Sequence, residues 1–228
     1  MDEKQLAAEY SVNYIEDGMI VGLGTGSTVS LMLHKLAERI KTGLNISAVS
    51  TSQATSKLAS SLGIKIVKLI DIDHIDVTID GADEVDENLN GIKGGGGALL
   101  HEKIIASNSK RNIWIVDSSK LVKTLGQFPL PVEVVKLGYT HLCVKLENLK
   151  YTPKLRLSGD KPFITDDNNY ILDLKVGSIP NPRDLDMKIK SLAGVVETGL
   201  FYGIADTVVA GVGGKIKIFN KKKRVQTQ

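Results

Sequence analysis

Short apolar runs alternate with stretches of helical periodicity along the first half of the chain. The apolar runs have the length of buried strands, and several are followed directly by glycine, serine or threonine. This alternation predicts a mainly parallel sheet with helices on both faces. The predicted strands are residues 19–23, 46–49, 64–69, 75–79 and 113–116, and the predicted helices are residues 2–17, 29–40, a segment ending at 62 and one beginning near 98.

The order of predicted elements changes after Pro129 and Pro131. The next segments predict the order strand, helix, strand, strand, helix, strand, which is that of a split βαβ, or ferredoxin-like, unit. These segments are residues 132–137, 139–149, 153–158, 170–176, 183–193 and 195–201, and strand patterns at 207–212 and 216–219 are expected to return to the first sheet. We therefore expect an α/β fold with a Rossmann-like domain at residues 1–130 and 206–228 and a smaller inserted α+β domain at 131–205.

Composition narrows the class of protein. The 228 residues are 42% hydrophobic and 24% charged with a net charge of +3, values typical of a globular protein. Aromatic residues are only 5% and scattered, and we interpret the basic run at 221–224 as a solvated tail, so nucleic-acid binding is not indicated.

Targeting signals are not apparent in the sequence. The first residues lack the apolar core of a signal peptide, and no run approaches the ~20 apolar residues of a membrane span, so we expect neither export nor membrane insertion. Cys143 is the single cysteine and the four histidines are dispersed, which excludes an intrachain disulfide and gives no spacing typical of a catalytic metal. We therefore expect a cytoplasmic protein without a metal.

The glycine-rich segment at residues 22–28, GLGTGST, lies between a predicted strand and a predicted helix. Backbone N–H groups and the dipole at a helix N-terminus favour an anion there, and Thr25, Ser27 and Thr28 add hydroxyl groups. The dinucleotide fingerprint fails because Ser27 occupies the third glycine position, and the P-loop fails because its Gly-Lys-Ser/Thr is missing. The segment favours a small phosphorylated or polyhydroxylated ligand, with an ordinary capped turn as the alternative.

Four acidic residues lie within residues 80–86, directly after the predicted strand 75–79. Their mutual repulsion is costly unless they bind something, and ligands of open α/β sheets bind at the carboxyl ends of strands. Ala82 and Glu84 break the spacing of an EF-hand calcium loop. The segment is therefore either part of a ligand site or a solvated acidic turn.

Four consecutive glycines at residues 94–97 separate Lys93 from the predicted helix that carries Glu102. Such a run costs conformational entropy, so it indicates positive φ angles or close approach of the backbone to another group. A flexible linker is the alternative, although the run lies between two predicted core elements. Glu102 falls early in the helix, within reach of whatever the glycines bind, whereas a lone helical glutamate is usually on the surface.

Two further polar segments follow predicted strands. We interpret residues 50–55, STSQAT, as helix caps rather than ligand contacts. Residues 117–120, DSSK, would bring Lys120 to the edge of the sheet where the other segments end. Because the carboxyl ends of parallel strands share one edge, all five segments are expected to meet in one cleft.

Taken together, these segments resemble the ribose-5-phosphate isomerase A family. The order and spacing of the motifs agree from end to end of the chain. The motifs are GTGST at 24–28, DGADE at 80–84, KGGGGAL at 93–99, EKIIA at 102–106, DSSK at 117–120, FPLPVEV at 128–134 and GVVETGLF at 194–201.

The resemblance implies an aldose–ketose isomerase without cofactor or metal that interconverts ribose 5-phosphate and ribulose 5-phosphate through an enediolate, in the non-oxidative branch of the pentose phosphate pathway. It implies that Glu102 is the base, that Lys93 and the glycine-run amides stabilise negative charge, and that Asp80 and Asp83 bind sugar hydroxyls and assist ring opening. A homodimer or dimer of dimers is also implied. The implied substrate-binding residues are Thr25, Gly26, Ser27, Thr28, Asp80, Gly81, Ala82, Asp83, Lys93, Gly94, Gly95, Gly96 and Lys120.

Two positions depart from the usual pattern of the family, and two other classes of protein compete with it. Gly97 extends a glycine run that is often followed by alanine, and His101 stands where arginine is more common. An amino-sugar-phosphate deaminase or phosphosugar lactonase would need a differently placed acid–base set. A non-catalytic sugar-phosphate sensor would normally carry a DNA-binding domain, for which we expect no room in this chain.

Overall fold

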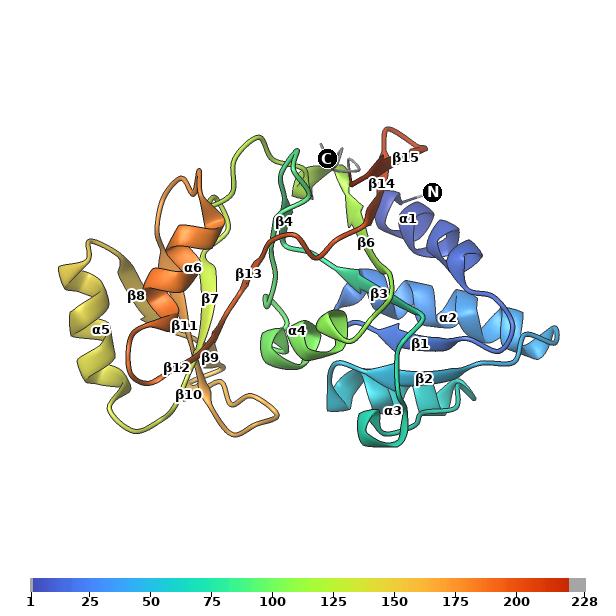
Figure 1. The fold of residues 1–228 in the computed structure, drawn as a ribbon, viewed down its shortest axis with the longest axis horizontal. Helices are drawn as coiled ribbons and strands as arrows, with labels where there is room; N and C mark the ends of the chain where they lie inside the picture. Colours follow the sequence, from blue (N-terminus) through green and yellow to red (C-terminus); the bar gives the residue numbers. More distant parts are fainter. Residues whose placement is uncertain (1, 222–228) are drawn as a thin grey trace, which may run out of the picture.

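The computed structural model describes residues 2–221 and arranges them in two lobes (Figure 1). The helices are α1 (Glu3–Ser11), α2 (Ser27–Lys41), α3 (Gln53–Ser61), α4 (Leu99–Ser107), α5 (Tyr139–Asn148) and α6 (Pro182–Lys190), with 3-10 turns η1 (Val12–Tyr14), η2 (Leu69–Asp71) and η3 (Ser118–Lys120). The strands are β1 (Ile20–Leu23), β2 (Ser47–Ser50), β3 (Val77–Gly81), β4 (Glu84–Val85), β5 (Gly91–Ile92), β6 (Asn112–Asp117), β7 (Leu130–Val134), β8 (Thr152–Leu155), β9 (Leu157–Ser158), β10 (Lys161–Pro162), β11 (Tyr170–Lys175), β12 (Val195–Thr198), β13 (Leu200–Phe201), β14 (Thr207–Val212) and β15 (Lys215–Asn220).

The larger lobe is built on a six-stranded sheet in the order β15-β14-β6-β3-β1-β2, whose pairs are parallel except for the β14–β15 hairpin. Continuous apolar runs form its central strands because both faces of the sheet are covered. Helices α1 and α2 pack over one face around Val21 and Leu23, whereas Ile105 of α4 packs against the other. The pairing of β14 with β6 confirms that the chain returns to this sheet after the second lobe.

The strand order reverses between β1 and β3, which are parallel neighbours. From β1 the chain crosses through α2 to β2 on one side, whereas β3 continues to β6 on the other. The loops that leave β1 and β3 therefore run in opposite directions, and such a switch point is where open α/β sheets bind ligands.

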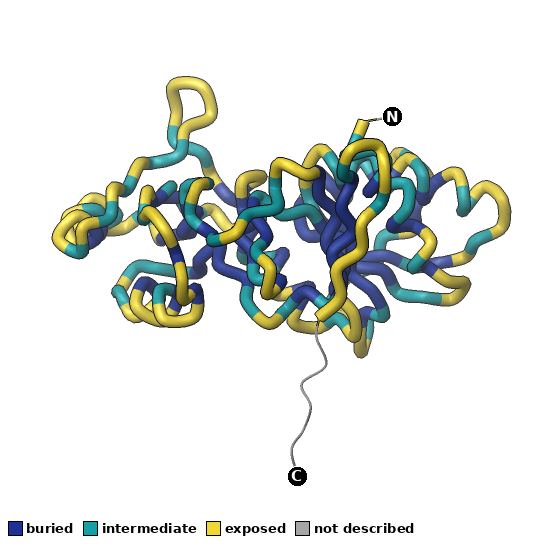
Figure 2. Tube along the Cα trace, turned by 90° about the horizontal axis from the view of Figure 1, so that it is seen from above, coloured by how far each residue is buried: buried dark blue, intermediate teal, exposed yellow. Residues whose placement is uncertain are grey.

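The smaller lobe contains an antiparallel sheet in the order β12-β7-β11-β8. With α5 between β7 and β8, and α6 between β11 and β12, this is the ferredoxin-like order predicted from the sequence. Its core combines β7 residues such as Val132 with Leu146 of α5 and Ile189 of α6. Figure 2 shows the buried residues inside both lobes, with the exposed residues mostly at the loops.

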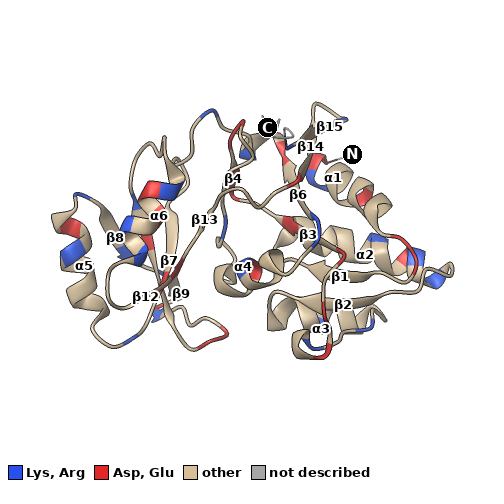
Figure 3. Ribbon diagram, viewed as in Figure 1, with Lys and Arg blue, Asp and Glu red and all other residues tan. Residues whose placement is uncertain are grey.

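A three-stranded sheet in the order β13-β5-β4 lies where the chain passes between the lobes (Figure 1). Phe201 of β13 packs edge-to-face on Trp114 of β6, with ring centroids 6.3 Å apart, and both side chains are buried. Charged residues of both signs are spread over the two lobes (Figure 3). Within residues 2–221, no helix has the length and apolar character needed to cross a membrane.

The predicted strand 153–158 is divided at Arg156 into β8 and β9, which belong to different sheets, and three further predicted elements differ from the structure. Residues 64–69 do not form a strand: only Ile66 forms an isolated parallel bridge, with Ala48, before the chain turns into η2 beyond the sheet edge. The predicted helix at 2–17 ends at Ser11 and tightens into η1, where Val12 and Asn13 have lower helix propensity than the alanines before them. Most of the predicted basic tail lies outside the described residues.

The last difference is at residues 195–201, which were expected to form one strand. They form β12 and β13, in two different sheets. The break is at Gly199, where a Cβ atom would lie 2.2 Å from the carbonyl oxygen of Lys93. Gly199 thus lets the chain pass directly against the backbone of Lys93 and accept its N–H at 2.9 Å.

Candidate active site

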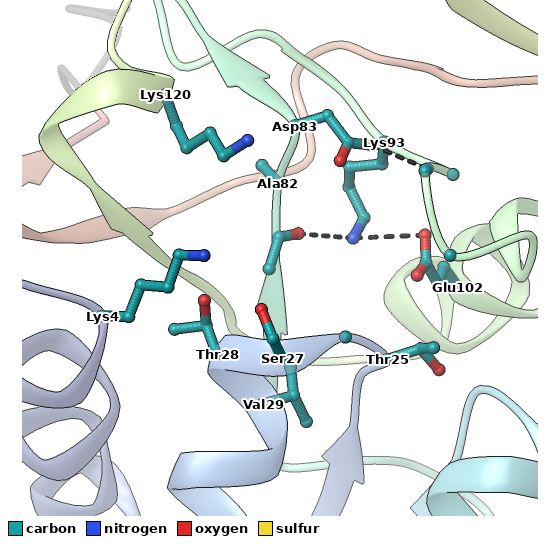
Figure 4. Close-up of a pocket in the computed structure, with 15 residues that line it drawn as sticks. Lys4, Thr25, Ser27, Thr28, Val29, Ala82, Asp83, Lys93, Glu102 and Lys120 are labelled. Carbon is teal, nitrogen blue, oxygen red and sulfur yellow. Dashed lines mark hydrogen bonds and ion pairs between the residues drawn. The ribbon is translucent and has the colours of Figure 1, made fainter.

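A pocket opens at the switch point of the larger sheet, between the loops after β1 and β3 (Figure 4). Every residue implied by the resemblance lines it except Asp80, which is buried and contacts Lys93. The residues at 50–55 do not line it. The lining residues are Lys4, Thr25, Gly26, Ser27, Thr28, Val29, Gly81, Ala82, Asp83, Lys93, Gly94, Gly95, Gly96, Glu102 and Lys120.

A buried lysine and two buried carboxylates lie together at one end of the pocket, where Lys93 and Glu102 line it and Asp80 lies behind Lys93. The Nζ atom of Lys93 lies 2.8 Å from Oδ2 of Asp80 and 3.3 Å from Oε2 of Glu102, and it donates a hydrogen bond to the carbonyl of Gly81 at 2.6 Å. The three charged side chains are each exposed by only 3 to 4%. A single charge, or two charges of the same sign, would be unstable when buried there. The lysine and the carboxylates therefore stabilise one another.

The carboxyl group of Glu102 is only partly satisfied by its neighbours. Its Oε2 atom faces Lys93 at an ion-pair distance, but the geometry gives it no hydrogen bond within the part of the chain that the structure describes. Burial, followed by the negative charge of Asp80, raises the pKa of Glu102 to about 8 despite the opposing charge of Lys93. Glu102 is therefore poised to gain and lose a proton near neutral pH.

Lys93 keeps its proton although it is buried. Burial alone would lower its pKa, but the carboxylates of Asp80 and Glu102 together outweigh that effect and raise it above the ordinary value for lysine. The side chain also lies over the ring of Phe201, with Nζ 5.3 Å from the ring centroid. Lys93 is thus a fixed cation next to the buried carboxyl group of Glu102.

Asp80 ties the loops after β1 and β3 together. Its Oδ1 atom accepts hydrogen bonds from the N–H groups of Thr25 at 3.1 Å and Gly81 at 2.7 Å, while Oδ2 pairs with Lys93. Gly24 allows this approach, because a Cβ atom there would lie 1.9 Å from Oδ1 of Asp80. Both carboxylate oxygens are therefore engaged within the protein.

The other acids after β3 are distributed among separate partners. Asp83 lines the pocket and its Oδ2 accepts the N–H of Gly95 at 2.7 Å. Glu84 is buried and accepts the N–H of Gly126 at 2.7 Å, and Asp86 accepts backbone N–H groups of the turn that follows it. The crowding of these acids along the sequence is therefore relieved in the fold.

The glycine run has the properties that its sequence predicts. Gly94 and Gly97 have φ angles of 101° and 83°, which side chains disfavour. A Cβ atom on Gly95 would lie 2.5 Å from Oδ1 of Asp83, and one on Gly97 would lie 2.4 Å from the ring of Phe163. The run is therefore an ordered part of the pocket wall between β5 and α4.

The opposite end of the pocket has the features of an anion site. Helix α2 begins at Ser27 after Gly26, which has a φ of 126°, and no side chain of the described residues caps its first N–H groups. These N–H groups and the positive end of the helix dipole favour a negatively charged group. Figure 4 shows the amino group of Lys4 near Thr28, and Lys120, which also lines the pocket, with its amino group near Ala82.

Lys4 and Val29 were not expected from the sequence. Lys4 reaches the pocket because Glu3, its neighbour on α1, accepts hydrogen bonds from the N–H and Oγ of Ser118 at 3.0 and 2.6 Å. Ser118 begins η3, which carries Lys120, so one carboxylate brings the two lysines together. The hydrogen bond from the Ser118 hydroxyl is the main cause that lowers the pKa of Glu3.

The residues at 50–55 support the pocket from outside. The Ser52 side chain accepts the N–H of Thr55 at 3.1 Å, so the interpretation of this segment as a helix cap is confirmed. Hydroxyl groups of this segment also surround Oγ1 of Thr25, with Thr51 at 2.7 Å and Ser52 at 2.8 Å. This buried hydroxyl cluster fixes the start of the loop that leads into α2.

Helix α4, which carries Glu102, is held by the next residue along the chain. Lys103 points to the other side of the helix and pairs with Glu197 at 2.9 Å, while it donates to the carbonyls of Thr198 and Leu200 at 2.8 and 2.9 Å. Burial lowers the pKa of Lys103 despite the nearby Glu197 carboxylate. Across residues 2–221, the structure has no group of three or more His, Cys, Asp or Glu side chains arranged to hold a metal ion.

Fold and pocket together are those of an α/β enzyme with a buried carboxyl group beside a fixed cation and, at the other end of the pocket, the N-terminus of a helix. Known proteins of this kind include close relatives of the chain. Residues 47–214 match the family model of ribose 5-phosphate isomerase A (phosphoriboisomerase A). The chain belongs to the ribose-5-phosphate isomerase A family.

The relatives match nearly the whole chain. The ribose-5-phosphate isomerase A of Streptococcus thermophilus is 50% identical over 226 residues, covering 97% of this chain and 100% of that protein. That of Levilactobacillus brevis is 50% identical over 210 residues, covering 91% and 92%. Among solved structures, a D-ribose-5-phosphate isomerase in complex with phospho-erythronic acid has a TM-score of 0.93 at 39% identity, covering 96% of this chain and all of that one. The enzyme of Methanocaldococcus jannaschii has a TM-score of 0.91 at 38% identity, covering 96% and 98%.

Proposed function

We propose that this chain interconverts ribose 5-phosphate and ribulose 5-phosphate, with Glu102 as the group that moves the proton. The observation that carries the assignment of Glu102 is its buried carboxyl group, whose pKa is raised to about 8 and whose Oε2 atom lacks a hydrogen-bond partner in the described structure. It lies in the same pocket as an uncapped helix N-terminus and two lysines. The distribution of these groups fits a substrate with a reactive carbonyl at one end and a phosphate at the other.

The reaction needs one carboxylate and one fixed cation. The carboxylate of Glu102 takes the proton from C2 of the open-chain aldose, the C–H electron pair forms the C1=C2 double bond, and O1 becomes an enediolate oxygen. Lys93 and backbone N–H groups of the glycine run stabilise that negative charge. Glu102 then returns the proton to C1 while the proton of O2 is transferred to O1, which gives the 2-ketose.

Asp83 and Asp80 have different surroundings in the pocket and receive different roles in this proposal. Asp83 faces the pocket, so its carboxylate is suited to bind a sugar hydroxyl and to assist ring opening. Asp80 uses both oxygens inside the protein, so it acts on the reaction by holding Lys93 and the loop after β1. The phosphate is placed at the start of α2, between Lys4 and Lys120.

The ligand in the solved complex of a relative, phospho-erythronic acid, carries both kinds of group that this proposal requires. That ligand joins a phosphate to a four-carbon sugar acid. Its carboxylate is planar and negatively charged, as is the enediolate end of the proposed intermediate. A ligand of this kind fits a pocket with an anion site at one end and Lys93 at the other.

Location, assembly and domain division are further parts of the proposal. We place the enzyme in the cytoplasm as a homodimer or dimer of dimers. Exposed apolar side chains on the smaller lobe, Leu137 at 91% and Val144 at 55%, offer a surface for self-association. We also propose that residues 1–130 with 206–228 and residues 131–205 are two domains. Light scattering after size-exclusion chromatography tests the assembly, and limited proteolysis tests the division.

The test of the proposed function is turnover by the purified protein. Ribose 5-phosphate and EDTA are added, and ribulose 5-phosphate is followed by proton NMR, with an aminosugar phosphate and a phosphosugar lactone as alternative substrates. We expect turnover of ribose 5-phosphate alone, unaffected by the chelator. Binding of sugar phosphate without turnover would favour a sensor, and turnover of either alternative substrate in its place would favour the deaminase or lactonase.

A further inference from the structure

An arginine from the smaller lobe reaches the glycine run of the pocket. Arg156 lies between β8 and β9, far in sequence from Gly94 and Gly95. Its Nη1 atom donates to the carbonyl of Gly94 at 2.7 Å and to that of Gly95 at 3.1 Å. The smaller lobe thus contacts the backbone of the pocket wall directly.

The guanidinium of Arg156 is itself fixed by an acid on the neighbouring strand. Its Nε donates to Oδ2 of Asp173 at 3.0 Å, and its Nη2 donates to Oδ1 of the same carboxylate. The Arg156 side chain is 13% exposed, and its guanidinium also lies over the ring of Phe163, 5.9 Å from the centroid. Four of the five N–H groups of this fork are therefore in use, two on an anchor and two on the glycine run.

The two carbonyls determine where the next N–H groups point. The peptide bonds here are trans, so the C=O and N–H of one peptide unit point in opposite directions. The carbonyl of Gly94 faces Arg156, and the N–H of the same unit, on Gly95, donates to Asp83 at 2.7 Å. The carbonyl of Gly95 also faces Arg156, so the N–H of Gly96 points away from the arginine.

The Gly96 N–H is available to a ligand. Gly96 lines the pocket, and within residues 2–221 its N–H donates no hydrogen bond. A cation on the carbonyl of a peptide unit also polarises its N–H, which strengthens that N–H as a donor. Arg156 therefore holds the carbonyl ends of two peptide units. The N–H of the first donates to Asp83, and the N–H of the second belongs to Gly96, which lines the pocket.

We propose that Arg156 is a positioning residue that orients and polarises the peptide units of the glycine run so that the Gly96 N–H stabilises the enediolate oxygen. This inference rests on the isomerase function proposed above. Arg156 touches neither the substrate nor Glu102, and its effect on the reaction passes through the backbone. The inserted lobe thereby takes part in catalysis instead of only covering the pocket.

The chemistry of arginine is necessary for this role. A planar fork binds the Asp173 carboxylate along one edge and carbonyl oxygens along another, whereas the ammonium group of lysine is a single point charge. Phe163 gives independent support, since its ring occupies the space beside Gly97 where a Cβ atom would lie 2.4 Å away. The segment that follows Arg156 is therefore fitted to the glycine run at a second point.

The test compares Arg156→Ala and Arg156→Lys with the wild type. Arg183→Ala removes an exposed arginine of α6 that lies outside this pocket and is the matched control. We expect kcat to fall about 10- to 100-fold in Arg156→Ala, the size of effect expected from misplaced catalytic groups, with a smaller fall in Arg156→Lys and a KM within about threefold. The control should match the wild type.

Binding measurements separate positioning from a general loss of structure. We expect Arg156→Ala to bind phospho-erythronic acid about tenfold more weakly, because the carboxylate end uses the glycine-run donors, while inorganic phosphate binds as in the wild type. Asp173→Asn keeps the arginine but weakens its anchor, so it should also lower kcat. This variant provides the test if Arg156→Ala does not fold. The inference about Arg156 alone is overturned if the wild type is active and kcat stays within twofold of it in folded Arg156→Ala, Arg156→Lys and Asp173→Asn. It is also overturned if Arg156→Ala binds phospho-erythronic acid and inorganic phosphate more weakly by the same factor. An inactive wild type overturns the proposed function instead.

Discussion

The two ends of the pocket use positive charge in different surroundings. At the end with Glu102, Lys93 is 3% exposed and two carboxylates lie within ion-pair distance. At the end with the start of α2, Gly26 and Ser27 are exposed, and Lys4 and Lys120 are partly exposed. A charge excluded from water interacts strongly with its neighbours, whereas a solvated charge is screened. The buried end is therefore suited to control a proton and the open end to attract and hold an anion.

This difference predicts that the two ends affect different kinetic constants. Groups at the buried end contact the part of the substrate whose charge changes during the reaction, so their loss should appear in kcat. Groups at the open end contact a phosphate whose charge stays constant, so their loss should appear in KM. The four predictions below follow this difference from the largest effect to the smallest.

Of these four predictions, the one with the largest expected effect is Lys93→Met. Removal of the cation leaves Asp80 and the developing enediolate without their counter-charge, so kcat should fall by about 10²- to 10³-fold. Unfolding by urea should also show a loss of about 3 kcal/mol, because a buried carboxylate loses its partner. A variant with unchanged stability would contradict the assigned role of Lys93 in the buried cluster.

The pH dependence should follow the buried end alone. Glu102 acts as base only when deprotonated, so with its pKa raised to about 8 the value of kcat/KM should rise with pH up to that value. The rise should be roughly tenfold per unit at pH values well below 8. The Lys120→Ala variant should show the same profile at a lower level. A flat profile between pH 6 and pH 8, measured by initial rates, would rule out titration of Glu102 as its cause.

A smaller effect is expected at the open end. Lys4→Ala and Lys120→Ala should each raise KM about tenfold and change kcat by less than about threefold. The rise in KM corresponds to the loss of one charge-assisted hydrogen bond, which is weakened because the lysines are partly exposed to solvent. Added salt should raise the wild-type KM more than that of either variant. A variant whose kcat falls while KM stays constant would show that the two ends are not separable.

The smallest effect is expected for Glu3→Gln. Glu3 contacts neither the pocket nor the proposed substrate, and it acts by joining α1 to Ser118 of η3. The amide can keep one of these hydrogen bonds, so KM should rise only about twofold with kcat unchanged. Steady-state kinetics beside Glu9→Gln, a substitution on the same helix, provides the comparison. A twofold change in both variants would mean that the pairing with Ser118 is not the cause.

The sequence predicted the parts of the fold and site that depend on local pattern. The strands β1 and β3 are short buried runs, and Gly24 follows the first while Asp80 lies at the end of the second, so their place at one sheet edge follows from the α/β pattern. The glycine run was likewise recognisable, because only close approach or positive φ explains four glycines between two core elements.

What the sequence did not reveal depends on contacts between distant segments. Lys4 lies in the pocket because Glu3 binds Ser118, 115 positions away. Arg156 reaches Gly94 across 62 positions, and no local motif marks it. The break of the predicted strand 195–201 at Gly199 arises from packing against Lys93. The different surroundings of Asp80 and Asp83 also depend on which way each side chain turns, which spacing along the chain does not determine.

The central claim is that Glu102 moves the proton, and Glu102→Gln tests it most directly, because the amide keeps the shape of the side chain and removes the base. Ribulose 5-phosphate formation would be measured for wild type and variant with EDTA present, together with binding of ribose 5-phosphate. We expect the variant to lose about 10³-fold in kcat while it binds substrate within a few-fold of the wild type. Turnover by the folded variant within tenfold of the wild type would show that another group is the base.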